Sequence, residues 1–213
     1  MNPSRIFFAC VFAAHTGLAQ NLVVNGSFET PPAGGSFVSY GGGGNIGGWT
    51  VGGSGVDHIG GFWQAADGTQ SVDLNGANAG SVFQDLVTIP GGQYRIRFAL
   101  AGNPFGFEAK HLSVLWDGAQ VGDFTFDPAG TSANAMGWIY QTINVTAPDA
   151  LARLEFLSTT GAMPGSQGVT TFYGPALDDI SVIVGVPEPG SLALLLGGAA
   201  ACAVRRRAPV RGR

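Results

Sequence analysis

The sequence predicts an all-β protein, folded as a β-sandwich or barrel, for the central part of the chain. Apolar residues alternate with polar ones along several short segments, and Gly, Pro, Asn and Asp separate these segments. Alternation with period two places every second side chain on one face of a strand. No stretch of ten or more residues in this part shows a convincing helical period, and the 35 glycines of the chain favour turns. Many short strands with glycine-rich turns are typical of sandwiches and barrels.

The clearest strand is predicted at residues 94–100, where four apolar side chains face one way and Arg95 and Arg97 face the other. Residues 21–24 are expected to form a strand at the start of this region. Residues 33–48 are rich in glycine and are expected to form a flexible loop, because no helix follows to make them a phosphate cradle. The same alternation predicts further strands at residues 111–117, 123–127, 138–145, 152–158 and 177–184.

Residues 1–19 indicate a secretory signal peptide. Arg5 precedes a short apolar run, and the small residues Gly17 and Ala19 stand at the positions expected before a cleavage site. An N-terminal membrane anchor is the alternative, but the run is short and contains His15.

The last segment, residues 186–213, indicates a transient membrane handle. Residues 191–204 are uncharged and mostly apolar, but a helix that spans a bilayer core needs about 20 apolar residues. Five arginines follow, from Arg205 to Arg213, and arginines beside an apolar run hold that end on the cytoplasmic side of a membrane. A buried C-terminal helix and a permanent short anchor are the alternatives.

The region between these ends, residues 20–185, is strongly acidic. Of the 10 basic and 14 acidic residues of the chain, four basic and 13 acidic residues lie in it, which gives a net charge of −9. Nucleic acids and anionic membrane surfaces bind basic patches, so the charge opposes binding to either, and no nucleic-acid partner is expected. The region has no cysteine, which excludes thiol catalysis and a cysteine zinc site. The charge suits a soluble exported domain and the capture of divalent cations.

Several short motifs of this region follow one another in an order that resembles a known family. They are NLVVNGSFE at 21–29, GWTV at 48–51, VDHI at 56–59, WQAADGTQSVDLNG at 63–76, FALAGNP at 98–104 and YGPALDDISV at 173–182. The chain resembles the bacterial choice-of-anchor family and a plant cell-wall domain of unknown function. The resemblance implies a jelly-roll β-sandwich of the galactose-binding-like type over residues 20–185, the architecture of many carbohydrate-binding modules.

The C-terminal segment resembles a PEP-CTERM sorting signal. Its sorting motif is followed by the short apolar run and the arginines, and it consists of Val186, Pro187, Glu188 and Pro189. Proline disfavours helix in the residue before it, which keeps this motif extended and accessible. The resemblance implies export in a Gram-negative bacterium that makes exopolysaccharide. It also implies an exosortase as partner, a transient stage in the inner membrane, and a final place at the cell surface or in the extracellular matrix.

The same family resemblance implies one structural calcium ion where the first and last strands meet. Its ligands would be Glu29 and Asp178, with Asp179 as a possible second aspartate. Calcium prefers several oxygen ligands, including carboxylates and backbone carbonyls. The alternative is that Glu29 and Asp178 only accept hydrogen bonds from the backbone or face solvent.

Candidate sugar-binding residues come from the same motifs. Aromatic rings stack on sugar rings, and a few polar groups fix the hydroxyls. Trp63 is expected in a loop, clear of the core, because glycines precede it, whereas Trp49 is more often a core residue. Asp67 precedes a glycine and is first a turn signal. The full set of candidates is Trp49, Asp57, His58, Trp63, Gln64 and Asp67.

No enzyme motif stands out in the sequence. The chain lacks a Gly-x-Ser-x-Gly elbow, a P-loop and a His-Glu-x-x-His pair, and a Ser-His-Asp site is recognised in space rather than in sequence. The expected function is therefore non-enzymatic binding of exopolysaccharide or another glycan by an exported protein. A carbohydrate-active enzyme and a purely structural matrix subunit are the alternatives.

Overall fold

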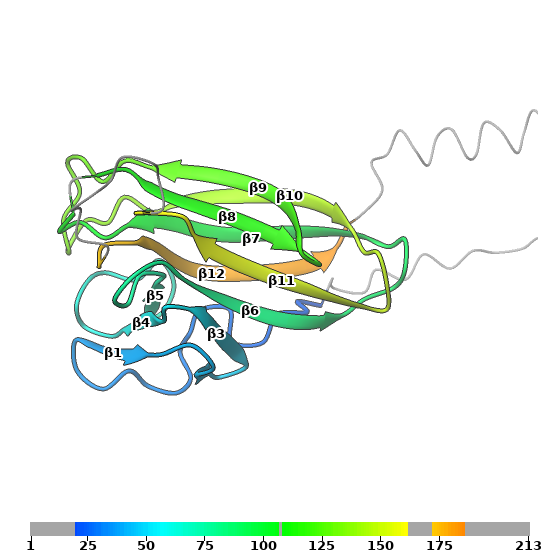
Figure 1. Cartoon of the computed structure of the whole chain (residues 1–213), viewed down its shortest axis with the longest axis horizontal. Helices are drawn as coiled ribbons and strands as arrows, with labels where there is room; N and C mark the ends of the chain where they lie inside the picture. The colour runs from blue at the N-terminus through cyan, green and yellow to red at the C-terminus, as the bar shows by residue number, and fades with distance from the viewer. Residues whose placement is uncertain (1–19, 107, 162–171, 186–213) are drawn as a thin grey trace, which may run out of the picture.

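The computed structural model describes residues 20–106, 108–161 and 172–185, and these form two stacked antiparallel sheets (Figure 1). The described residues contain twelve strands and no helix. The strands are β1 Phe37–Tyr40, β2 Asn45–Ile46, β3 Trp49–Gly53, β4 Val56–Ile59, β5 Ser71–Asp73, β6 Gly80–Val87, β7 Gln93–Gly102, β8 Lys110–Trp116, β9 Ala119–Phe126, β10 Ile139–Thr146, β11 Leu151–Ser158 and β12 Pro175–Val184.

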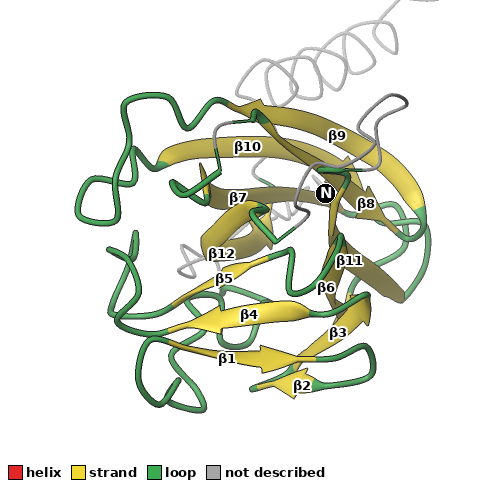
Figure 2. Cartoon of the chain, turned by 60° about the vertical axis from the view of Figure 1, so that its left-hand side comes forward, coloured by secondary structure: helices red, strands yellow, loops and turns green. Residues whose placement is uncertain are grey.

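One sheet has the strand order β1-β4-β5-β12-β7-β10 and the other has the order β2-β3-β6-β11-β8-β9 (Figure 2). From β5 to β8 and again from β9 to β12, successive strands lie in different sheets. The predicted jelly-roll β-sandwich is thereby confirmed. The predicted strand at residues 94–100 lies within β7, where Tyr94 and Ile96 are buried and Arg95 points to the other face.

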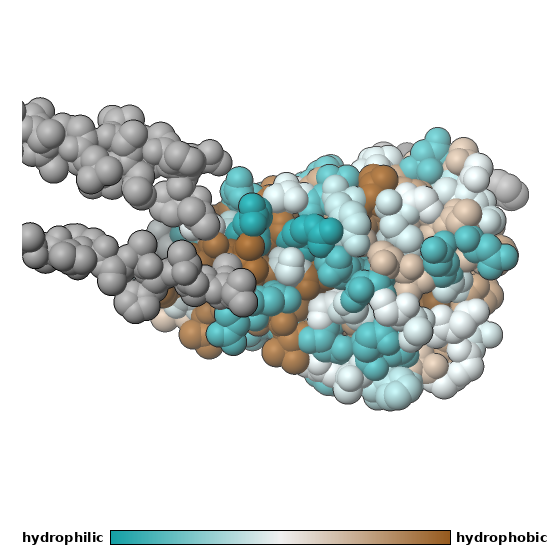
Figure 3. All heavy atoms as spheres, turned by 180° about the vertical axis from the view of Figure 1, so that it is seen from behind, coloured by the Kyte–Doolittle hydropathy of each residue, from teal (hydrophilic) through white to brown (hydrophobic). Residues whose placement is uncertain are grey.

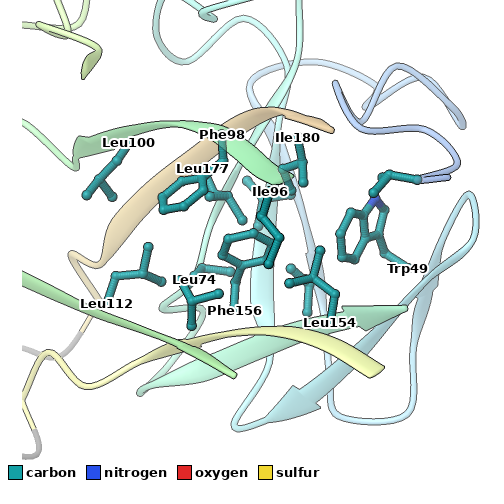
Figure 4. Packing of buried hydrophobic residues seen from close by; sticks show 14 of the residues in the cluster. Trp49, Leu74, Ile96, Phe98, Leu100, Leu112, Leu154, Phe156, Leu177 and Ile180 are labelled. Carbon is teal, nitrogen blue, oxygen red and sulfur yellow. The ribbon is translucent and has the colours of Figure 1, made fainter. Parts of the chain in front are cut away.

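The core lies between the two sheets and is closed by aromatic rings (Figure 4). Phe98 on β7 meets Phe156 on β11 edge to face, with ring centroids 5.0 Å apart. Trp49 on β3 packs against the same Phe156 at 6.2 Å. Such contacts bury large apolar areas, and this burial holds the sheets together.

Two predictions about the first part of the region are wrong. Residues 21–24 form no strand, because the Asn21 side chain accepts the N–H of Val182 on β12 at 2.8 Å and leaves only a short main-chain contact, from Leu22 N to Val182 O. The segment of residues 33–48 is not a plain loop, because β1 within it pairs with β4 and β2 pairs with β3. Long-range pairing here overrides the local glycine content.

The sandwich has two different ends. The connections after β5, β7, β9 and β11 gather at one end, which we call the loop end. The described chain begins and ends at the opposite end, which we call the tail end (Figure 1): Gly185 donates its N–H to Gln93 O at the start of β7, and Gln20 lines the same hollow as Val87 at the end of β6. The predicted signal peptide and the predicted sorting tail fall outside the described residues. The part of the chain that the structure describes has no helix long and apolar enough to cross a membrane.

Candidate ligand-binding site

A cleft of about 370 Å³ opens at the loop end, beside the pair of strands β1 and β4. Its lining residues come from these two strands, from the turns next to them, and from the residues just after β5 and just before β12. They are Phe37, Ser39, Tyr40, Gly41, Ser54, Asp57, Gly76, Ala77 and Phe172. We call this hollow the β1–β4 cleft.

The polar centre of the β1–β4 cleft is a pair of side chains on neighbouring strands. Ser39 and Asp57 are directly opposite each other in the β1–β4 ladder, so their side chains share one face of the sheet. The Ser39 hydroxyl donates to Asp57 Oδ1 at 2.5 Å. Partial burial raises the pKa of Asp57, although this hydrogen bond acts in the opposite sense. The Asp57 carboxyl can accept hydrogen bonds from hydroxyl groups placed in the cleft.

Aromatic rings flank this polar pair. Phe37 is 45% exposed and Phe172 is 54% exposed, and Tyr40 is partly buried. A chain of ring contacts continues from Phe37 to Phe62 at 5.7 Å and from Phe62 to Phe105 at 5.1 Å. Exposed rings next to a few fixed polar groups form the kind of surface on which a sugar ring stacks.

A second carboxyl group lies behind the cleft. Asp73 on β5 is the ladder partner of Asp57 and is almost fully buried. Asn103 Nδ2 donates to Asp73 Oδ2 at 2.7 Å, while the N–H groups of Asn75 and Gly174 donate to Oδ1. Burial raises the pKa of Asp73 to about 7, and the negative charge of Asp57 adds to this effect. These contacts tie β5 to the connections before β8 and β12, so they fix the shape of the loop end.

The structure buries three of the six residues predicted to bind sugar. Trp49 is fully buried, as the core alternative expected, and its Nε1–H donates to Asn25 O. His58 is fully buried and its Nε2 lies 2.8 Å from Phe28 O, and desolvation lowers its pKa. Trp63 lies in a loop but is only 5% exposed, because it packs with the core and donates to Ser71 Oγ. The expectation that Trp63 stands clear of the core is therefore corrected.

The other predicted residues are accessible but not assembled. Gln64 is fixed through its backbone, since its carbonyl accepts the Trp138 indole N–H at 2.9 Å. The Asp67 side chain accepts the Ser27 hydroxyl at 2.7 Å. Of the six candidates, Asp57 is the one found among the described residues that line the β1–β4 cleft.

The predicted calcium ligands hold one loop from two sides. Glu29 accepts hydrogen bonds from the backbone of Thr69 and Gln70 and from the Thr69 hydroxyl, all at 2.8–2.9 Å. Partial burial would raise the pKa of Glu29, but these hydrogen bonds outweigh it, and the pKa lies below its ordinary value. Asp178 Oδ2 accepts the N–H groups of Ala66 and Asp67. The loop of residues 66–70 is thereby clamped between the first segment of the domain and β12.

These hydrogen bonds compete with calcium for the predicted ligands. The carboxylate oxygens of Glu29 and Asp178 accept N–H and O–H groups, so calcium could use only the lone pairs that remain. Asp179 lies in a β-bulge with φ of 43° and pairs instead with Arg97 at 2.9 Å. The described residues contain no group of three or more His, Cys, Asp or Glu side chains that could hold a metal ion. Calcium binding stays a prediction, with a competing use for its proposed ligands.

Sequence reasoning missed the aromatic residues of the cleft. Phe37, Ser39 and Tyr40 lie in the segment expected to be a loop, and Phe172 is 135 positions away from Phe37 in the chain. Three of the four residues 37–40 are aromatic or β-branched, which favours a strand, but the segment is too short for a clear pattern.

The family model DUF642, described as a protein of unknown function, matches residues 21–183. The chain belongs to the DUF642 family. This DUF642 protein is also similar to halomucin of Haloquadratum walsbyi, with 27% identity over 174 residues. The match covers 76% of the DUF642 chain but 2% of halomucin, so the chain spans a very small part of that relative's length.

Three solved structures resemble this DUF642 protein in their general fold. A native family 35 carbohydrate-binding module from Clostridium thermocellum is 12% identical with a TM-score of 0.47, and the match covers 71% of the DUF642 chain and 100% of the module. The CBM22-1 xylan-binding domain from Paenibacillus barcinonensis is 15% identical with a TM-score of 0.48, and the match covers 78% of the DUF642 chain and 95% of the domain. TmCBM61 in complex with β-1,4-galactotriose is 15% identical with a TM-score of 0.45, and the match covers 78% of the DUF642 chain and 100% of TmCBM61.

Proposed function

We propose that this DUF642 protein is an exported, non-catalytic glycan-binding protein, and that the β1–β4 cleft holds the glycan. The observation that carries the proposal is the Ser39–Asp57 pair, which lines one cleft together with the exposed rings of Phe37 and Phe172. A sugar ring offers apolar C–H faces to the aromatic rings and hydroxyl donors to the carboxyl group. The cleft therefore offers aromatic rings to the apolar face of a sugar and a carboxyl group to its hydroxyls.

The charge of the cleft favours a neutral glycan. Among its described lining residues Asp57 is the charged one, and the region of residues 20–185 carries a net charge of −9. Like charges repel, so a polymer of uronic acids or sulfated sugars is disfavoured. A neutral exopolysaccharide is the ligand class that fits.

Retention on polysaccharide gels tests the proposal. The wild-type protein should be slowed by at least one neutral polysaccharide, and Phe172→Ala and Asp57→Asn should each weaken retention by about tenfold in Kd, about 1.4 kcal/mol. Tyr140→Ala is the matched control, because Tyr140 is 48% exposed on β10 and is not among the residues lining the cleft. The proposal would be contradicted if all four proteins were retained equally, or if the wild-type protein bound no polysaccharide even at millimolar sugar concentration. Either result would favour a purely structural matrix subunit.

A glycan-cleaving enzyme is the second candidate, because Asp57 and Asp73 are neighbouring carboxyl groups with raised pKa values. Paired carboxyl groups are the chemistry of glycoside hydrolysis. Asp73, however, is 2% exposed and is engaged by Asn103, Asn75 and Gly174, so a substrate reaches Asp57 alone. Release of new reducing ends during binding, abolished by Asp57→Asn, would favour the enzyme.

We further propose that residues 186–213 act as a PEP-CTERM sorting signal, with Val186, Pro187, Glu188 and Pro189 as the motif that an exosortase recognises. The support is the order of motif, short apolar run and arginines in the sequence. The mature protein would then reach the cell surface or the matrix of a Gram-negative bacterium after a stage in the inner membrane. A permanent short anchor is the alternative.

A further inference from the structure

Five exposed aliphatic side chains gather at the tail end of the sandwich. A soluble surface carries scattered apolar residues, but a group of strongly exposed ones marks an interaction site. We call this group the aliphatic rim. It consists of Val24, Val87, Ile89, Leu151 and Val184, which are 61%, 77%, 69%, 54% and 51% exposed.

The members of the aliphatic rim are connected through neighbouring elements. Val87 and Leu151 are ladder partners at the ends of β6 and β11. Val24 and Val87 line the same hollow of about 450 Å³. Ile89 donates its N–H to the Tyr94 hydroxyl, and Tyr94 is the ladder partner of Val184. Figure 3 shows apolar atoms gathered toward this end of the molecule.

The chain itself indicates what covers the rim. Val184 belongs to it, and residues 186–190 are all that separates Gly185 from the apolar run of residues 191–204. Five residues span at most about 17 Å when fully extended. The apolar residues 6–19 likewise lead into the tail end at residue 20. A membrane that holds either apolar segment therefore lies within a short reach of the rim.

We propose that the aliphatic rim docks on the lipid surface while the tail of the chain is held in the membrane. This rests on the proposed role of residues 191–204 as a membrane handle. Exposed aliphatic side chains enter the boundary between headgroups and acyl chains, and their burial there supplies the binding free energy. The neighbouring Asp85 is paired with Arg153 at 2.7 Å, which reduces the charge that would otherwise resist docking.

Docking on lipid also orients the protein. The β1–β4 cleft lies at the loop end, and a sandwich that rests on its tail end points this cleft away from the membrane.

The test uses the full chain in vesicles of phosphatidylethanolamine and phosphatidylcholine, because the net charge of −9 over residues 20–185 opposes an anionic surface. Cys10 and Cys202 are replaced by serine, and a single cysteine carries an environment-sensitive fluorophore at Ile89→Cys. The matched control is Ala129→Cys, which is exposed at the loop end. At position 89 we expect the emission to shift to the blue when vesicles are added, and to be quenched when the lipid carries a nitroxide. At position 129 we expect neither effect. Adding Val87→Ser and Leu151→Ser should reduce the effect at position 89.

Each other result overturns the proposal in a recognisable way. If the chain floats with the vesicles but the probe at position 89 stays in water, the docking surface is ruled out and the membrane handle is retained. A chain that does not float with the vesicles removes both. A blue shift without lipid, growing with protein concentration, assigns the rim to a second copy of the chain instead.

Discussion

The side-chain amide of Asn103, at the end of β7, donates a hydrogen bond of 2.7 Å to the buried carboxyl group of Asp73 at the end of β5. Asn103 Oδ1 in turn accepts the N–H of Phe105, which belongs to the chain of aromatic rings beside the cleft. A buried group with a raised pKa is thus built into the support of the loop end.

Stability should depend on pH through Asp73. Its pKa is 3.8 as a free side chain and about 7 in the folded protein, so between these values the folded state binds more protons than the unfolded state. The contribution of Asp73 to the free energy of unfolding is therefore greatest at low pH and decreases as pH rises through this range.

Urea unfolding of wild-type protein and Asp73→Asn at pH 5, 6, 7 and 8 measures this contribution. The variant loses some stability at every pH, because its new amide faces the Asn103 amide. It should nevertheless show a weaker decrease with pH than the wild type. The difference between the two slopes isolates Asp73 from His58, whose lowered pKa acts in the opposite sense. Parallel slopes would mean that Asp73 is ionised throughout.

The clamp on residues 66–70 should stabilise the fold without calcium. Glu29→Ala removes a charged acceptor of three hydrogen bonds and should lower the free energy of unfolding by about 1.5–3 kcal/mol. Asp123→Ala, at an exposed position on β9, is the control. We expect the same loss with calcium and with a chelator. A wild-type melting temperature that drops on chelation, with the drop absent in Asp178→Asn, would support the calcium site instead.

Truncation of Trp63 should lower the stability of the fold strongly, whereas truncation of Phe172 should hardly change it. Trp63→Ala removes a buried ring and the hydrogen bond to Ser71, so it should cost about 3–5 kcal/mol of stability. Phe172→Ala removes an exposed ring and should change stability by no more than about 0.5 kcal/mol. Chemical denaturation of both variants gives the comparison, and an unchanged unfolding midpoint for Trp63→Ala would argue against its place in the core.

Gly26 should not accept any side chain. A Cβ atom at this position would stand against the carbonyl oxygen of Ile180, with no space between them. Because this contact is with backbone, Gly26→Ala should lower stability by about 3 kcal/mol. Gly34→Ala is the matched control, since its Cβ would meet nothing within 4 Å. Equal melting temperatures of the two variants would refute this close approach.

Sorting should depend on the motif of the proposed tail. Changing Pro187, Glu188 and Pro189 together to alanine should leave export intact and trap the protein in the inner membrane. Fractionation of cells and medium measures this, with a substitution of the same size at residues 129–131 as a control. Release of the variant at the wild-type level would count against the sorting signal.

The strands that could be predicted from sequence are those whose own residues decide their burial. Every second side chain is apolar over seven residues in β7 and over five residues in β8, so no other element has to be known to assign the faces. β1 and β2 could not be found in this way, because each is short and lies in a glycine-rich segment. Their existence depends on pairing with β4 and β3, which a local pattern does not contain.

The candidate site was less accessible to sequence reasoning for a similar reason. Asp57 was found through its motif, but Phe172 reaches the cleft only because β12 lies beside β5 in the folded sheet. Trp63 was misplaced because glycines before an aromatic residue suggest an exposed loop. The residues that cover it, among them Phe62 at a ring distance of 5.7 Å, act through loop packing that composition does not show.

The contact of Asn21 and Leu22 with Val182 has a mechanical consequence. Wherever the chain continues on both sides, it enters and leaves the domain at neighbouring points. The domain therefore projects to one side of the chain rather than lying in line with it. A pull along such a chain first loads the contacts of Asn21 and Leu22 with Val182, together with the last pairs of β12 with β7. The cleft lies at the far end of the sheets, so it is remote from the contacts that such a pull loads first.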